Sequence, residues 1–265
     1  MSDGPSKSHG QRRARPSTAP QDLMSRRAAM SKGWMAQVIT LVPETYPGVL
    51  GASLTGKALA EGLWQLEPID LRVFGEGKHR KVDDTPAGGG PGLVLRADIM
   101  AKAVRFAQRA QSLPLVYLSP RGRRFDQAMA QAWAAGPGVC LIAGRFEGLD
   151  QRAIDHFGIA EVSLGDFVLT GGDLAAQAMI DATVRLLPGV LGNAASAEDE
   201  SFSDGLLEHP QFTRPSEWEG RVIPEVLTSG DHGAVERWRQ SERARITREM
   251  RSDLWDRYVT RQKDD

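Results

Sequence analysis

Three glycine clusters follow apolar runs in the first two-thirds of the chain and limit the folds it can adopt. They occupy residues 88–92, 144–148 and 163–173. In the third cluster an apolar tetrapeptide lies between two glycine turns, with Asp166 and Asp173 at its ends. Glycine permits positive φ and close approach of the backbone, so such turns can present N–H and C=O groups to a small molecule. None has the spacing G-x-G-x-x-G, which argues against an ordinary nicotinamide site.

The apolar runs alternate with segments of helical pattern. We expect strands at residues 35–42, 69–74, 113–118, 139–143 and 159–163. We expect helices at residues 54–64, 99–110 (with Asp98 as its cap), 125–133, 149–157 and 174–187. This alternation predicts an α/β fold with a mostly parallel sheet and helices on both faces. Ligands of such sheets bind beyond the carboxyl ends of the strands, where the turns at Ser119-Pro120, Gly144 and Gly165 are expected.

Charge and cysteine content exclude several classes of protein. The 265 residues carry 33 Lys and Arg against 34 Asp and Glu, so the whole chain is not a polybasic nucleic-acid binder. No apolar run is long enough to span a membrane, and we expect no membrane association. The one cysteine, Cys140, lies in an apolar run, which excludes a disulfide within the chain and predicts a buried thiol in a cytoplasmic protein.

Composition also predicts how the chain is divided. Residues 1–32 are polar and basic, and we interpret them as a disordered extension, with an organelle transit peptide or a true start at Met30 as alternatives. Residues 33–192 form the α/β domain, and 193–208, which contain consecutive acids, form a mobile linker. Residues 209–265 form a small helical domain, whose arginines are candidates for phosphate contacts.

Motifs of other enzyme classes are incomplete or absent in this sequence. Residues 51–58 approach the phosphate loop G-x-x-x-x-G-K-[ST], but Ala58 stands where a hydroxyl must ligate Mg²⁺. A phosphate-loop nucleotidase, which would depend on Lys57, is therefore a minor alternative. The five histidines lack metal-ligand spacing, so no metal site is expected, and no serine lies in G-x-S-x-G.

An ordered set of short segments resembles the bacterial tRNA (guanine-N1) methyltransferases, the TrmD family. Each segment is weak alone, but the set is highly specific in this order and covers about residues 34–240. The segments are residues 88–93, 118–122, 144–150, 164–172, 187–192, 212–215, 229–232 and 238–239.

The resemblance implies a fold of the SPOUT class, with a deep trefoil knot in the parallel sheet and a C-terminal helical domain. It implies a homodimer with active sites shared across the interface. The implied reaction transfers the methyl group of S-adenosylmethionine to N1 of guanosine 37, next to the anticodon of tRNA. A requirement for Mg²⁺ in catalysis stays open.

The resemblance also assigns residues to the cofactor site. Leu164 and Leu169 would form apolar walls, with core packing as the alternative, and Glu147 would approach the sulfonium, with a plain surface acid as the alternative. The full set expected to bind the cofactor is Tyr117, Leu118, Ser119, Pro120, Gly144, Phe146, Glu147, Leu164, Gly165, Asp166, Phe167, Val168, Leu169, Gly171 and Gly172.

Guanine N1 carries a proton at neutral pH, so its methylation requires a base, and a cation near O6 would stabilise the charge that develops there. By resemblance, Arg185 supplies the cation, with a solvated arginine at a helix end as the alternative. The family's base is an aspartate in the linker, and here Glu200 stands in register, with Asp199 one residue earlier. Ser196 and Arg214 are assigned to substrate binding.

The sequence departs from the family pattern at several positions. The glutamate at the base position keeps a second hypothesis open, a non-catalytic RNA- or nucleotide-binding protein with the same fold. Leu93 stands where methionine is common, and Phe146 and Phe167 replace frequent tyrosines, so hydrogen bonds from those hydroxyls are absent.

Overall fold

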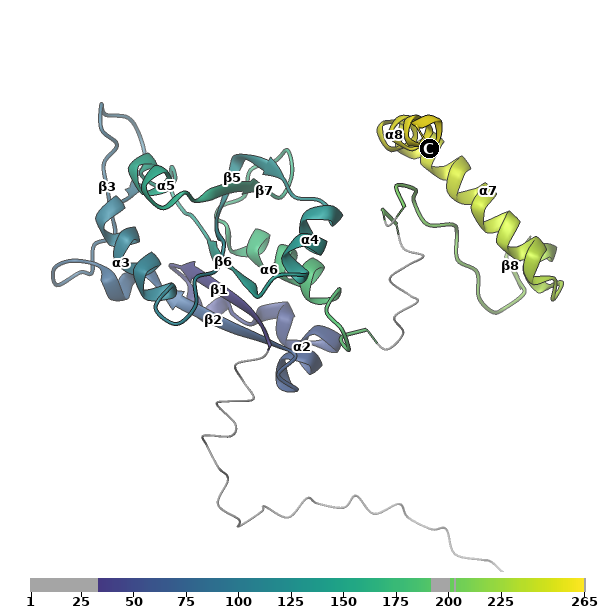
Figure 1. Ribbon diagram of the computed structural model, residues 1–265, viewed down its shortest axis with the longest axis horizontal. Coiled ribbons are helices and arrows are strands. Elements are labelled where there is room, and N and C mark those ends of the chain that lie inside the picture. The colour runs from purple at the N-terminus through teal and green to yellow at the C-terminus, as the bar shows by residue number, and fades with distance from the viewer. Residues whose placement is uncertain (1–32, 192–200, 203, 265) are drawn as a thin grey trace, which may run out of the picture. The chain divides into compact units, whose positions relative to one another are not determined.

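The computed structural model describes residues 33–191, 201–202 and 204–264 (Figure 1). Residues 33–191 are built around a five-stranded sheet of order β2-β1-β6-β5-β7, in which every neighbouring pair is parallel. The strands are β1 (Trp34–Thr40), β2 (Trp64–Asp70), β5 (Leu115–Arg124), β6 (Gly138–Ile142) and β7 (Ala160–Ser163). The helices are α2 (Ser53–Ala60), α3 (Ala97–Ala107), α4 (Gln127–Ala134), α5 (Gln151–Phe157) and α6 (Asp173–Val184). The α/β class and the parallel sheet predicted from the sequence are confirmed.

Successive side chains of each strand enter two separate cores. Along β6, Val139 and Leu141 pack into one core and Cys140 and Ile142 into the other, as the period of two in a strand requires. Residues of α2, α4 and α6 complete the first core, and residues of α3 and α5 complete the second. In Figure 1 these two groups of helices lie on opposite sides of the strands. Both faces of the sheet are therefore covered.

The expected strand at residues 69–74 is wrong. The second strand is Trp64–Asp70, and Leu71–Phe74 form a 3-10 helix, η3. The preceding helix ends at Ala60 rather than Trp64, and Gly62, at φ 75°, turns the chain back. Trp64 then enters the core, where its indole N–H donates to the carbonyl of Thr55 at 2.9 Å.

Two further boundaries differ from expectation. Helix α3 starts at Ala97 with Arg96 as its N-cap, so Asp98 is not the cap and instead pairs with Arg96 at 2.6 Å. Strand β5 runs to Arg124 instead of ending at Leu118. Both Leu118 and Arg123 are opposite Val162, so residues 119–122 bulge out of the ladder.

The remaining elements are smaller. Strands β3 (Asp83–Asp84) and β4 (Val94–Leu95) form an antiparallel pair after η3. After residue 200 the chain forms the hairpin β8 (Glu217–Trp218) and β9 (Arg221–Val222), then α7 (His232–Met250) and α8 (Ser252–Asp264).

The expected helical character after Asp231 is confirmed. The Asp231 carboxylate caps α7 by accepting from the N–H of Ala234 at 2.9 Å. Within the described ranges, no helix is both long and apolar enough to cross a bilayer.

Candidate functional site

A pocket of about 400 Å³ opens beyond the carboxyl ends of β5, β6 and β7. Its volume falls in the range that small-molecule sites occupy. Three stretches supply nearly all of the lining, residues 117–121, 144–149 and 162–172 without 166, and Ala175 of α6 completes it. Every residue that the sequence assigned to cofactor binding is in this lining except Asp166. The side chain of Asp166 is 91% exposed, and its carboxylate lies 4.0 Å from Arg124.

Two glycines bring the pocket-forming loops together. The N–H of Gly172 donates to the carbonyl of Gly144 at 2.9 Å, which joins the second loop to the third. A Cβ on Gly172 would lie 2.8 Å from the Cα of Ala143, and one on Gly144 would lie 2.6 Å from the Tyr117 ring. The pocket therefore keeps this shape only while both positions lack a side chain.

Tyr117 lies beneath the second loop. Its ring is buried, and burial raises the pKa of its hydroxyl, with a smaller opposing effect from the positive charge of Arg121. The side chain thus stays neutral and offers a rigid surface below Gly144.

The apolar residues of the third loop have different exposures. Leu164 is half-buried and packs against the first core, so it serves the core and the pocket wall together. Phe167 and Val168 are 55% and 82% exposed, although both line the pocket. Such exposure of large apolar side chains is typical of a surface that binds a ligand or a partner.

Glu147 lies on the rim of the pocket. Its backbone N–H donates to the carbonyl of Leu93 at 2.9 Å, and a Cβ on Gly92 would collide with its side chain. The first glycine cluster therefore lies against the second, and the carboxylate is an exposed anion at the pocket entrance.

A buried polar network that was not predicted from the sequence lies at the pocket edge. Asp173 is 6% exposed, and it accepts from Thr40 Oγ1 at 2.5 Å and Tyr46 Oη at 3.2 Å through Oδ1. Its Oδ2 accepts from Arg145 at 3.3 Å. Burial, and next the charge of Asp173, raise the pKa of Tyr46. The sequence shows only an acid just before an expected helix, because the partners of Asp173 are far from it in sequence.

Arg145 connects two pocket loops. A Cβ on Gly171 would lie 2.7 Å from its Nε, and that buried Nε has no hydrogen-bond partner among the described residues. The residue was within the expected segment but was not assigned a role. The other lining residues that were not assigned a role are Arg121, Gly148, Leu149, Val162, Ser163, Thr170 and Ala175.

Among the predicted catalytic residues, Arg185 is described by the structure, and it is not part of this pocket lining. Glu200, Asp199 and Ser196 lie outside the described residues. Arg185 is the half-buried C-cap of α6, the helix whose other end borders the pocket. Twelve residues at 1.5 Å each separate the two ends by about 18 Å. Arg214 is exposed and precedes Pro215.

The structure argues against the phosphate loop. Two short 3-10 helices, Pro43–Thr45 and Gly48–Gly51, separate β1 from α2, where a phosphate loop would follow the strand directly. Lys57 is an exposed residue on α2 that pairs with Glu61 at 3.8 Å. In the part of the chain that the structure describes, no three His, Cys, Asp or Glu residues are grouped to hold a metal.

A parallel sheet with a glycine-lined pocket beyond its carboxyl ends defines the class of α/β proteins whose small-molecule sites lie at that edge of the sheet. Comparison with known sequences specifies the family. Residues 35–257 match the family described as tRNA (Guanine-1)-methyltransferase TrmD, and the chain belongs to this family.

Several bacterial relatives are similar over nearly their whole length, and all are named tRNA (guanine-N(1)-)-methyltransferase. The relative from Ruegeria sp. (strain TM1040) is 64% identical over 230 residues, which cover 86% of this chain and 94% of the relative. The relative from Jannaschia sp. (strain CCS1) is 60% identical over 237 residues, which cover 88% and 96%. The relative from Nitrobacter winogradskyi is 58% identical over 222 residues, which cover 84% and 93%. The family predicted from the sequence is confirmed.

Proposed function

We propose that this protein transfers the methyl group of S-adenosylmethionine to N1 of guanosine 37 in tRNA, in the cytoplasm. The observation that carries the proposal is the gathering of three segments distant in sequence, residues 117–121, 144–149 and 162–172, the last two rich in glycine, into one pocket beyond the strand ends. Family membership supports the class of reaction.

The pocket suits S-adenosylmethionine in size and chemistry. Gly144 and Gly172 line the pocket, and neither carries a side chain that would keep a ligand from the main chain. Leu164 and Leu169 provide apolar surface, and Glu147 provides an anion at the entrance for a sulfonium cation. When bound, the cofactor supplies a methyl group on a positively charged sulfur.

The residues of the chain must then manage one proton and one developing charge. Glu200 removes the proton from guanine N1, with Asp199 as the alternative base, and Arg185 stabilises the negative charge on O6. Ser196 and Arg214 bind the substrate. If Mg²⁺ takes part in catalysis, it would act on this charge too.

We propose a homodimer, in which each site is completed by the second copy. The distance of about 18 Å along α6 between the pocket edge and Arg185 supports this, because one chain does not bring that arginine to its own pocket. Exposed apolar side chains beside the pocket, Phe167, Val168 and Leu174, offer surface for the second copy.

We further infer the SPOUT-class trefoil knot within residues 33–192, followed by the linker 193–208 and a tRNA-binding helical domain from residue 209. The strand order supports the knot, because the chain passes from β6 across β5 to β7 and then returns to α6 against the first core. Gly172 passes against the backbone of Ala143 on this return.

Methyl transfer to a tRNA transcript with guanosine at position 37 tests the proposal. We expect Glu200→Gln to abolish transfer while cofactor binding persists, and Asp199→Asn to retain it. Full activity of Glu200→Gln beside an inactive Asp199→Asn would instead make Asp199 the base. If the wild type binds the cofactor but never transfers the methyl group, the chain is a non-catalytic RNA-binding protein.

A further inference from the structure

A short basic hairpin between η3 and β3 has no role in the pocket. Residues 76–81, here called the basic hairpin, are closed by two backbone hydrogen bonds between Glu76 and Lys81, at 3.1 and 2.9 Å. The N–H of Arg80 donates to the carbonyl of Gly77 at 3.2 Å within the turn. A Cβ on Gly75 would collide with the backbone of Arg80, so the tight turn requires glycine there. The tip therefore holds a defined shape.

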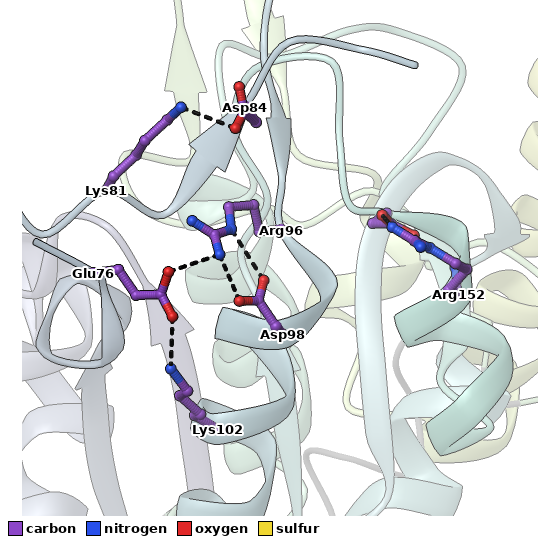
Figure 2. Close-up of polar contacts among 8 residues, drawn as sticks. Glu76, Lys81, Asp84, Arg96, Asp98, Lys102 and Arg152 are labelled. Atoms are coloured by element: carbon purple, nitrogen blue, oxygen red, sulfur yellow. Dashed lines mark hydrogen bonds and ion pairs between the residues drawn. The ribbon is translucent and has the colours of Figure 1, made fainter.

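The charges at the base of this hairpin are mutually satisfied (Figure 2). Glu76 pairs with Arg96 at 2.9 Å and with Lys102 at 3.4 Å, and Lys81 pairs with Asp84 at 2.9 Å. Hydrogen bonds from Arg96 and then Lys102 hold the pKa of Glu76 below its ordinary value. The carboxylates of the base are thus already engaged by cations of the base.

The tip has a different charge balance. Lys78, His79 and Arg80 are consecutive and exposed, and they form no ion pair with any described carboxylate. They border a shallow hollow of about 480 Å³, which Arg72 and the carboxylates of Glu76 and Asp83 also line. Positive charge therefore predominates at a tip whose backbone is already ordered.

Backbone ladders connect the basic hairpin to the rim of the pocket. Strand β3, which follows the hairpin, pairs with β4 through Asp83 and Leu95. The N–H of Leu95 in turn donates to the carbonyl of Gly148, a lining residue, at 2.9 Å. The basic hairpin is therefore joined by main-chain pairing to the loop that borders the pocket.

We propose that the tip of the basic hairpin binds backbone phosphates of the RNA whose guanine reacts in the pocket. Lysine serves as a point charge for phosphate, and arginine donates two hydrogen bonds to it. The contact positions the RNA and reads no base. This inference rests on the proposed function, since it takes the reacting RNA as the ligand.

The test compares the full-length wild type with Lys78→Gln/Arg80→Gln in binding a tRNA transcript over a series of salt concentrations. The variant loses two phosphate contacts and so releases about two fewer counterions on binding. Its slope of log K against log salt should therefore be lower in magnitude by about 1.4 to 1.8, and its affinity lower by about 10- to 30-fold at 0.15 M salt. We expect KM for tRNA to rise, while kcat and cofactor affinity stay unchanged.

A matched control removes two exposed positive charges elsewhere on the same domain. Lys57→Gln/Arg105→Gln changes exposed residues of helices α2 and α3 that do not line the hollow at the hairpin tip, and we expect it to keep the wild-type slope. An equal loss in the hairpin and control variants would indicate a general charge effect and overturn the proposal. So would wild-type tRNA affinity in the hairpin variant.

Two further outcomes separate this inference from its alternatives. If the hairpin variant kept its tRNA affinity but lost binding to poly-glutamate, the hairpin would be a site for acidic polypeptides, and the RNA assignment would be wrong. If the wild type transferred no methyl group but the variant still lost tRNA affinity, the proposed reaction would fail and the phosphate contact would stand.

Discussion

The network around Asp173 allows a stability prediction with an internal order. Asp173→Leu replaces the carboxylate by an apolar side chain of similar shape. It leaves the hydroxyls of Thr40 and Tyr46, both buried, without their acceptor, and it removes the anion that pairs with Arg145. Removing one partner of a buried charged network costs about 3–5 kcal/mol. That is a large part of the total stability of a typical domain.

Two milder variants divide that cost. Asp173→Asn keeps an oxygen for the two hydroxyls and loses only the charge opposite Arg145, whose side chain is 33% exposed. Solvent screening lowers the value of that pair, so we expect a loss of about 1–2 kcal/mol. Tyr46→Phe removes one hydrogen bond of 3.2 Å and should cost about 1 kcal/mol.

Urea denaturation measures all three variants, and an unchanged m-value confirms that the midpoints report stability. In the Asp173→Leu background, Tyr46→Phe should cost almost nothing, because its hydrogen bond is already lost. The reasoning is refuted if Asp173→Leu is no worse than Tyr46→Phe. It is also refuted if Asp173→Asn loses as much unfolding free energy as Asp173→Leu, because the charge of Asp173 and not its role as a shared acceptor would then dominate.

Two other predictions follow from burial and close packing. Gly172→Ala should destabilise the protein by about 1–3 kcal/mol and weaken cofactor binding, because its Cβ would lie 2.8 Å from the Cα of Ala143. Gly136→Ala is the control, since its Cβ would lie 3.4 Å from the nearest atom. Calorimetric titration and urea denaturation compare the two variants, and equal effects would contradict the prediction. Burial raises the pKa of Cys140 to about 12 from an ordinary value of 9.0, so between these pH values the unfolded thiol loses its proton first and stability falls as pH rises. Cys140→Ala should therefore lose less unfolding free energy than the wild type as pH rises over this interval. Reaction of Cys140 with a thiol reagent in the folded wild type would contradict its burial.

The sequence predicted those parts of the fold that depend on local pattern. Strand β6 is apolar throughout and was located within a residue, since both of its faces are buried. Strand β2 was misplaced because Trp64, Leu66 and Pro68 give no continuous apolar run, and its start depends on pairing with β1, where Trp64 is opposite Trp34. The bulge in β5 also depends on a partner strand, which no local signal reveals.

In the candidate site, too, the sequence predicts the parts that depend on local pattern and misses those that depend on distant partners. The glycine turns could be predicted from the sequence, because turns at strand ends have a local signature. The partners of Asp173 did not, since Thr40 and Tyr46 lie more than a hundred residues away in sequence and meet it only after the sheet forms. Family resemblance supplied the assignments to Arg185 and Glu200, which spacing alone could not provide.

The bulge in β5 has a consequence for how this pocket can diversify. Leu118 and Arg123 are both opposite Val162, so the residues between them are released from the ladder that fixes the strands. Ser119, Pro120 and Arg121 nevertheless line the pocket. An insertion or deletion there would reshape one wall while the sheet kept its pairing on either side. Residue identity is more constrained than length, because a Cβ on Gly122 in the bulge would collide with the backbone N of Val162, and one on Gly172 would lie 2.8 Å from the Cα of Ala143. This pocket can therefore change through the length of the segment 119–121 more readily than through side chains added at its glycines.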